Sequence, residues 1–207
     1  MPSVLCILGA YLLGSVSFAI VASRLFRLPD PRSYGSGNPG ATNVLRSGKR
    51  AAAACTLVGD LAKGFAAVAL ARHLAPVLGF GEATVAGCGL SVFLGHLYPL
   101  YFRFKGGKGV STAMGILLAM SPSLAGLALV CFAAVAAWSR YVSLASILAA
   151  VVAAAVSPAL LGWGPNCAAV ILIAALIIWR HRANIERLQS GTESKLAQRR
   201  SHTRPSA

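Results

Sequence analysis

Long apolar runs separated by short polar segments constrain this chain more than any other feature. Five runs are plain: Val4–Ala22, Ala51–Ala71, Ala83–Tyr101, Val142–Leu161 and Trp163–Trp179. A hydrophobic stretch of about 18 or more residues indicates a transmembrane helix. The chain is 57% hydrophobic, against roughly 45–50% for an average soluble domain. We therefore predict an all-α integral membrane protein with no separate soluble domain.

A sixth apolar stretch, Val110–Trp138, can be read either as one long span or as two short spans that turn at Ser121-Pro122-Ser123. The distribution of basic residues decides, because cytoplasmic loops of membrane proteins are enriched in Lys and Arg. Two spans place all but two of the 19 basic residues on one side, whereas one span would move Arg140 and the basic tail to the other. We predict seven transmembrane helices, with the N-terminus outside and the C-terminus in the cytoplasm.

Two glycine-rich, cation-bearing loops lie at the ends of apolar runs. They are GSGNPGATNVLR (Gly35–Arg46) and the KGGKG of FKGGKGVST (Phe104–Thr112). Glycines let backbone N–H groups surround an anion without side-chain clash, and nearby Lys and Arg balance its charge. The second loop lacks the GxxxxGK[ST] spacing of a nucleotide-binding loop. The pair predicts a phosphate site at the cytoplasmic face, although the cations of each loop could serve only as topology anchors.

The span Val110–Met120 is unusually short. Its 11 residues give a helix of about 16 Å, against a hydrocarbon core of about 30 Å. Irregular backbone at membrane depth is tolerated only where it is buried or lines a cavity. We therefore expect Lys105–Gly109 to dip below the headgroups and to line a cavity, at the positive end of the following helix.

Two further polar segments are predicted to meet the loops on this face. SRYVSLAS places Ser139, Ser143 and Ser146 at about one-turn intervals of a starting helix, where capping is the alternative role. His181 and Asn184 are spaced i,i+3, on one face of a predicted helical extension.

Three ionisable residues fall within or at the end of spans. Asp60 and Lys63 lie inside the second span, where they either pair with each other or mark a functional site. His96 lies near the end of the third span, where a core histidine is the commoner interpretation.

The composition also argues against two kinds of function, metal-dependent chemistry and nucleic-acid binding. The chain has only five acidic residues and no Cys or His in a metal-ligand spacing, so we expect no metal and no cofactor. Its net charge of +14 sits mainly in short loops and the tail, which indicates membrane orientation rather than nucleic-acid binding.

Four segments together resemble a known family. GSGNPGATNVLR, GHLYPLYFRFKGGKGVST and SRYVSLAS, in this order, resemble the three motifs of the bacterial membrane glycerol-3-phosphate acyltransferase that uses acyl-phosphate as donor, the PlsY family. HRANIERLQSGTESK is similar to the C-terminal signature of that family. The resemblance covers residues 1–195 as one domain and leaves 196–207 as a basic tail. We expect the segment Lys195–Arg204 to contact anionic membrane lipids.

The resemblance implies transfer of a fatty acyl group from acyl-phosphate to the 1-hydroxyl of sn-glycerol 3-phosphate, releasing lysophosphatidate and phosphate. It implies the first acylation of phospholipid synthesis, at the cytoplasmic face of the bacterial inner membrane, with a soluble enzyme supplying the donor. A transporter of glycerol phosphate or another organic phosphate is the alternative, because broken spans with glycine loops also fit transporters.

Residues carried over from the family motifs are the candidates for catalysis: Ser36, Arg46, Lys105 and Ser143. Further residues in or beside the same segments are candidates for substrate binding: Gly37, Asn38, Thr42, Asn43, His96, Gly106, Gly107, Lys108, Gly109, His181 and Asn184. We expect direct attack by the glycerol hydroxyl on the acyl carbonyl without an acyl-enzyme, since phosphate is a good leaving group that needs orientation and charge neutralisation.

Overall fold

The structure is a computed structural model that describes residues 1–196, and within this range the chain is helical without strands. The helices are α1 (Pro2–Gly14), α2 (Phe18–Leu25), α3 (Ala41–Leu45), α4 (Arg50–Leu78), α5 (Glu82–Leu97), the 3-10 turn η1 (Leu100–Phe102), α6 (Val110–Met120), α7 (Pro122–Ser139), α8 (Val142–Leu161), α9 (Pro165–Arg180) and α10 (Arg182–Gln189). The predicted all-α class is confirmed. Residues 197–207, most of the predicted basic tail, lie outside the described residues.

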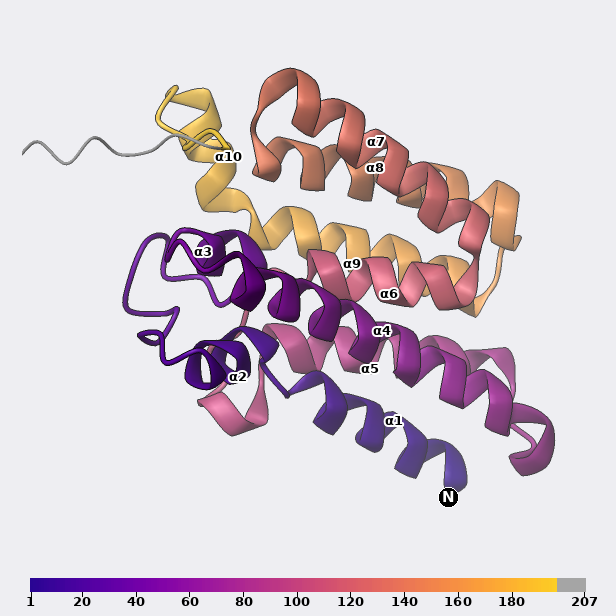
Figure 1. The fold of residues 1–207 in the computed structure, drawn as a ribbon. Coiled ribbons are helices and arrows are strands. Elements are labelled where there is room, and N and C mark those ends of the chain that lie inside the picture. Colours follow the sequence, from indigo (N-terminus) through magenta and orange to yellow (C-terminus); the bar gives the residue numbers. More distant parts are fainter. Residues whose placement is uncertain (197–207) are drawn as a thin grey trace, which may run out of the picture.

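Four helices are long and apolar enough to cross a membrane: α4, α5 extended through η1, α7 and α8. The bent pairs α1–α2 and α9–α10, with angles of 42° and 54°, raise this number to six if each pair is one span. The helix α6 is apolar but shorter. The long helices run alongside one another, and the N-terminus lies at the opposite end of the bundle from α3 and α10 (Figure 1).

The ambiguous stretch is two helices that turn at Ser121. Pro122 is the first residue of α7, and Ser121 Oγ accepts the N–H of Leu124 at 3.3 Å, which caps that helix. Proline suits the first helical turn because its missing N–H would have no helical partner there. The stretch is therefore two helices that turn where the sequence predicted, and not one long helix. That α6 crosses the membrane as a span of its own stays a prediction, because it is shorter than the candidate spans.

The first span is broken where the sequence predicted one continuous helix. Because α1 ends at Gly14 and α2 begins at Phe18, backbone carbonyls at the break lose their helical donors. Lys63 Nζ, buried in α4, donates to the carbonyls of Gly14 at 3.0 Å and Val16 at 2.7 Å. It also lies 2.8 Å from Asp60 Oδ1, so the mutual-pair interpretation is correct and the pair also stabilises the break.

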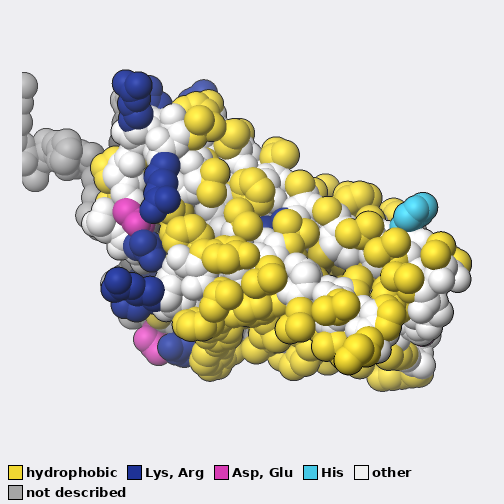
Figure 2. All heavy atoms as spheres, turned by 90° about the horizontal axis from the view of Figure 1, so that it is seen from below, with side chains coloured by type: hydrophobic (Ala, Val, Ile, Leu, Met, Phe, Trp, Pro, Cys, Tyr) yellow, Lys and Arg dark blue, Asp and Glu magenta, His cyan; other side chains and the backbone are white. Residues whose placement is uncertain are grey.

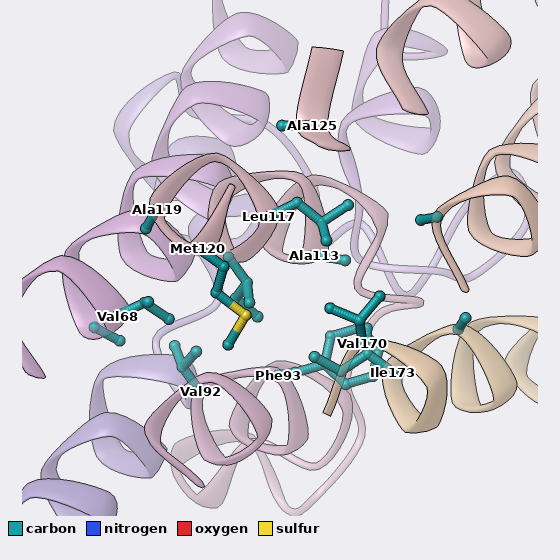
Figure 3. Close-up of a cluster of buried hydrophobic side chains, with 14 of the residues drawn as sticks. Val68, Val92, Phe93, Ala113, Leu117, Ala119, Met120, Ala125, Val170 and Ile173 are labelled. Carbon is teal, nitrogen blue, oxygen red and sulfur yellow. The ribbon is translucent and has the colours of Figure 1, made fainter. Parts of the chain in front are cut away.

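The core lies between α4, α5, α6 and α9, with Val68, Phe93 and Ile173 among its buried side chains (Figure 3). The helices α4 and α6 approach closely at two glycines. A methyl group added to Gly64 would overlap the Thr112 carbonyl, and one added to Gly115 would overlap the Leu61 carbonyl. Small residues at such crossings let helix backbones pack closely in a membrane.

The outer surface is apolar along the bundle and basic at one end. Val58 and Val130 are more than half exposed, as expected for side chains that face lipid. Trp138 lies in the last turn of α7 and Trp163 just before α9, and both are exposed, which is typical of aromatic residues at membrane interfaces. Figure 2 shows nearly all Lys and Arg side chains of that face gathered at one end of the molecule, with hydrophobic side chains covering the rest.

Candidate active site

The glycine loop Lys105–Gly109 packs against the end of α5. The N–H of Gly107 donates to the His96 carbonyl at 3.2 Å. A methyl group on Gly107 would overlap His96 Nε2 and come within 3.0 Å of the Pro39 carbonyl in the first loop. The two glycine loops, about 60 residues apart in the sequence, are therefore in contact, as the sequence predicted.

The start of α6 offers free backbone donors to this loop. Gly109 is the N-cap residue, with φ +83°, and no side chain in residues 1–196 caps the helix there. The first N–H groups of a helix have no helical acceptor, and the helix dipole makes this end positive. Arg103 and Phe104, just before the loop, both have φ above +50°, a rare conformation for residues other than glycine. Such strained backbone is often found at functional sites.

Lys108 connects the loop to the C-terminal segment. Its Nζ donates to Asn184 Oδ1, and Asn184 Nδ2 donates to Glu193 Oε1 at 2.6 Å. Arg187 Nε donates to the other oxygen of Glu193 at 2.7 Å. Burial, together with the charges of Arg187, Arg180 and Arg46, lowers the pKa of Lys108 to about 8, against the opposing effect of Glu193. Lys108 is therefore a partly desolvated cation inside a basic cluster.

Glu193 is the carboxylate in this cluster. Burial raises its pKa, but hydrogen bonds from Asn184 and Arg187, together with the nearby Ser143 hydroxyl, more than offset this effect and hold the pKa below its usual value. Ser143, on α8, is buried, and its Oγ has no hydrogen-bond partner among residues 1–196. A buried hydroxyl without a partner is available to a ligand.

The serines of SRYVSLAS do not share one helix, and that part of the prediction is wrong. Ser139 ends α7, where its Oγ donates to the Val135 carbonyl at 2.7 Å. Arg140 then adopts a left-handed conformation, φ +62°, and α8 begins at Val142. Ser143 alone of the three has a side chain without a backbone partner, since Ser146 Oγ donates to the Val142 carbonyl.

The predicted helical extension is also interrupted. The chain bends by 54° at His181, between α9 and α10, so His181 and Asn184 are not on one straight helix. His181 is buried, and its Nδ1 lies 2.8 Å from the Ile177 carbonyl. If Nδ1 donates this hydrogen bond, Nε2 is left as an acceptor. The bend carries Asn184 to Lys108.

The first loop is organised by Asn43. This buried side chain donates from Nδ2 to the carbonyls of Pro31 at 2.7 Å and Tyr34 at 3.1 Å, and its Oδ1 accepts the Ser36 N–H at 2.9 Å. Ser36 and Arg46 are exposed on the loop surface, and the charge of Arg46 is close enough to lower the pKa of Lys108. Gly37, with φ +67°, Asn38 and Thr42 complete the loop.

Two other predicted site residues, Lys105 and His96, differ from Lys108 in how far they are buried. Lys105 is exposed, whereas Lys108 is partly buried. His96 is buried at the end of α5, with Nδ1 3.4 Å from Asp60 Oδ1. It links the Asp60–Lys63 pair to the glycine loop.

Sequence reasoning missed three residues of the site: Arg180, Arg187 and Glu193. Arg180 donates to the carbonyls of Gly106 and Gly107, but at the end of a span it has the sequence signature of a topology anchor. Glu193 lies in the C-terminal segment HRANIERLQSGTESK. The one signal in the sequence that could have pointed to it is that the chain has only five acidic residues. Within the described range, no three His, Cys, Asp or Glu side chains are placed to hold a metal ion.

An apolar cavity lies between α6, α8 and α9, with Val110, Ala149 and Ile177 among its lining residues. Val110 directly follows the glycine loop, and Ser146, one turn beyond Ser143, also lines the cavity. The cavity and the polar cluster are therefore neighbours along α6 and α8.

Comparison with known proteins identifies the family. A sequence model described as glycerol-3-phosphate acyltransferase matches residues 4–191. The glycerol-3-phosphate acyltransferase of Nitrosospira multiformis is 53% identical over 96% of this chain and 98% of its own, and that of Bordetella pertussis is 52% identical over 92% and 90%.

The crystal structure of PlsY (YgiH), an integral membrane glycerol 3-phosphate acyltransferase, in its glycerol 3-phosphate form, superposes with a TM-score of 0.88 at 39% identity, covering 95% of this chain and 96% of that chain. The lysophosphatidic acid form gives 0.86 at 38% identity, covering 94% and 95%. The chain belongs to the glycerol-3-phosphate acyltransferase family, the family of PlsY.

Proposed function

We propose that this protein transfers a fatty acyl group from acyl-phosphate to the 1-hydroxyl of sn-glycerol 3-phosphate, giving 1-acyl-sn-glycerol 3-phosphate and inorganic phosphate. The observation that carries the proposal is the contact between two glycine loops, with basic side chains and free N–H groups, beside an apolar cavity. PlsY structures in glycerol 3-phosphate and lysophosphatidic acid forms support the acceptor and the product.

Two phosphate groups need two sets of cationic or N–H partners. Arg46 and Lys108 hold the phosphate of glycerol 3-phosphate, since Arg offers a fork that matches phosphate oxygens and Lys108 is a partly buried point charge. Lys105 and the N–H groups of Gly106, Lys108 and Gly109 balance the phosphate of the donor, whereas the Gly107 N–H donates to the His96 carbonyl. Anion binding at a helix start suits this second role.

The acyl transfer itself is a direct displacement. The glycerol oxygen attacks the acyl carbonyl carbon, the new ester C–O bond forms, and the bond from that carbon to the phosphate oxygen breaks. The hydroxyl proton leaves to a phosphate oxygen of the substrates. Because phosphate is a good leaving group, positioning and charge neutralisation supply the rate enhancement. Ser36 and Ser143 orient substrate oxygens, and His181 and Asn184 close the polar end of the site.

The carbonyl end of the acyl chain lies at the apolar cavity between α6, α8 and α9, whose volume of about 40 Å³ is too small for the whole chain. Its position beside Val110 and Ser146 supports delivery of the reactive carbonyl from the membrane side to the glycine loop. The short helix α6 allows the loop to lie at the depth of the acyl carbonyl.

We further propose seven spans, with α6 as the short one, the N-terminus outside and the loops in the cytoplasm. The clustering of basic side chains at the loop end supports this orientation (Figure 2). Residues 1–195 act as one domain in the bacterial inner membrane, and a soluble enzyme supplies acyl-phosphate.

The test follows phosphate release by purified, detergent-solubilised protein given acyl-phosphate, with and without glycerol 3-phosphate. We expect release that depends on the acceptor and is matched by lysophosphatidate, with loss of at least tenfold in Arg46→Ala and Lys108→Ala. Release without acceptor would indicate hydrolysis. Saturable glycerol 3-phosphate binding without turnover would favour the transporter alternative.

A further inference from the structure

The second glycine loop is held from the side of α9 by one side chain. Arg180, the last residue of α9, donates from Nη2 to the Gly106 carbonyl at 3.1 Å and to the Gly107 carbonyl at 3.0 Å. Its Nε also donates to the Gly107 carbonyl, at 3.2 Å. One guanidinium therefore fixes two consecutive carbonyl groups of the loop.

Fixing these carbonyls also fixes the N–H groups of the same peptide planes. In a planar trans peptide the C=O and N–H bonds point in opposite directions. The plane of the Gly106 carbonyl contains the Gly107 N–H, which points away from Arg180 and donates to the His96 carbonyl at 3.2 Å. The plane is thus held at both ends, by Arg180 and by the backbone of α5.

The next plane is held at only one end. It joins the Gly107 carbonyl, which Arg180 fixes, to the N–H of Lys108. That N–H has no hydrogen-bond partner in residues 1–196. By the same geometry it points away from Arg180, at the position where the loop meets the start of α6. It is an oriented donor that is free for an anion.

The guanidinium is itself held in place for this role. Its central carbon lies 6.0 Å from the centre of the Tyr98 ring, and the side chain is partly buried. No carboxylate in the described part of the chain forms an ion pair with Arg180. Its hydrogen bonds to protein therefore go to the loop. A lysine in this place has one point charge and cannot span two carbonyls with the fixed fork of arginine.

We propose that Arg180 is a positioning residue that sets the peptide planes of Gly106–Lys108, so that the Lys108 N–H faces the donor phosphate and the carbonyl oxygens face away from it. Without Arg180, the Gly107–Lys108 peptide is free to rotate and to turn a carbonyl oxygen toward the anion. The proposal rests on the proposed function for the identity of that anion, but the oriented donor suits any phosphate group.

The test compares Arg180→Ala and Arg180→Lys with Arg182→Ala as the matched control. Arg182 is a neighbouring arginine that stacks on Trp179 at 4.8 Å and does not contact the loop. We expect kcat/KM for acyl-phosphate to fall at least tenfold in Arg180→Ala, which is typical for a lost hydrogen bond to a charged group. Arg180→Lys recovers only part of the loss, and added guanidinium at non-denaturing concentration raises the activity of Arg180→Ala. Arg182→Ala stays within about twofold of the wild type.

A second measurement does not need turnover. Inorganic phosphate, the leaving group, should raise the unfolding temperature of the wild type and of Arg182→Ala, and Arg180→Ala should need at least tenfold more phosphate for the same shift. If the wild type transfers no acyl group yet shows this difference, the proposed function fails and the role of Arg180 stands. If Arg180→Ala behaves as Arg182→Ala in phosphate stabilisation and in guanidinium response, the role of Arg180 is overturned.

Discussion

The two glycine loops reach their conformations in different ways. The first loop, residues 35–46, is organised from within, because Asn43 bonds backbone groups of Pro31, Tyr34 and Ser36. The second loop, residues 105–109, is organised from outside, by the backbone of His96 and the guanidinium of Arg180. The difference shows that a glycine-rich loop can be a local structure in one segment and a product of helix packing in another.

The largest effect expected from this comparison is at Gly107. Gly107→Ala would drive a methyl group into His96 Nε2 and close to the Pro39 carbonyl, so the loop must move away from both. We expect kcat/KM to fall by about a hundredfold or more, since misplacement of about 1 Å can cost that much. Steady-state phosphate release measures it.

Gly126→Ala is the control for this change, since a methyl group on Gly126 meets nothing within 4 Å. Retention of activity in Gly126→Ala together with loss in Gly107→Ala supports packing of the loop against α5. Near-normal activity of Gly107→Ala would show that the contact is not needed.

An intermediate effect is expected at Asn43, which tests whether the first loop is self-contained. Asn43→Asp keeps the acceptor for Ser36 but loses both donors, leaving the carbonyls of Pro31 and Tyr34 unsatisfied. We expect roughly 1–3 kcal/mol of destabilisation and a higher KM for glycerol 3-phosphate, with little change in KM for acyl-phosphate. Lys49→Ala is the control, because Lys49 is an exposed residue. An equal rise in both KM values would mean that the loops are not independent.

The pH dependence of Lys108 gives a smaller effect. With a pKa of about 8, Lys108 is protonated below that pH and loses its charge above it. Between pH 7 and pH 9 the cationic fraction drops about tenfold, so we expect a similar fall in kcat/KM for glycerol 3-phosphate. In Lys108→Arg, whose charge persists through this range, the activity that remains should lack this fall. The same decline in Lys108→Arg as in the wild type would assign the titration to another group.

The sequence predicted those parts of the fold that depend on local patterns. The helix α8 spans the predicted Val142–Leu161, and the turn at Ser121-Pro122-Ser123 was predicted because two helices keep the basic residues on one side. The break after Gly14 was missed. No proline marks it, and its carbonyls are satisfied by Lys63 from another helix, a contact that no local pattern encodes.

The site, like the fold, was predictable where it depends on local sequence patterns and not where it depends on contacts between distant residues. The two loops and their convergence followed from glycine and charge patterns, but Lys105 and Lys108 are equivalent in sequence, and only packing turns Lys108 inward. Arg180 and Glu193 were missed because their roles consist of contacts with residues about ten to 70 positions away. The catalytic and binding roles of the predicted residues stay predictions until they are measured.

A double-mutant cycle between Arg46 and Lys108 tests the central claim most directly, since it asks whether two loops from different spans hold one phosphate. The measurement is kcat/KM for glycerol 3-phosphate in Arg46→Ala, Lys108→Ala and the double variant. We predict that the two effects do not add, with a coupling of about 1 kcal/mol or more, as for residues that share a partner. Additive effects, within about 0.3–0.5 kcal/mol, would contradict a shared phosphate site.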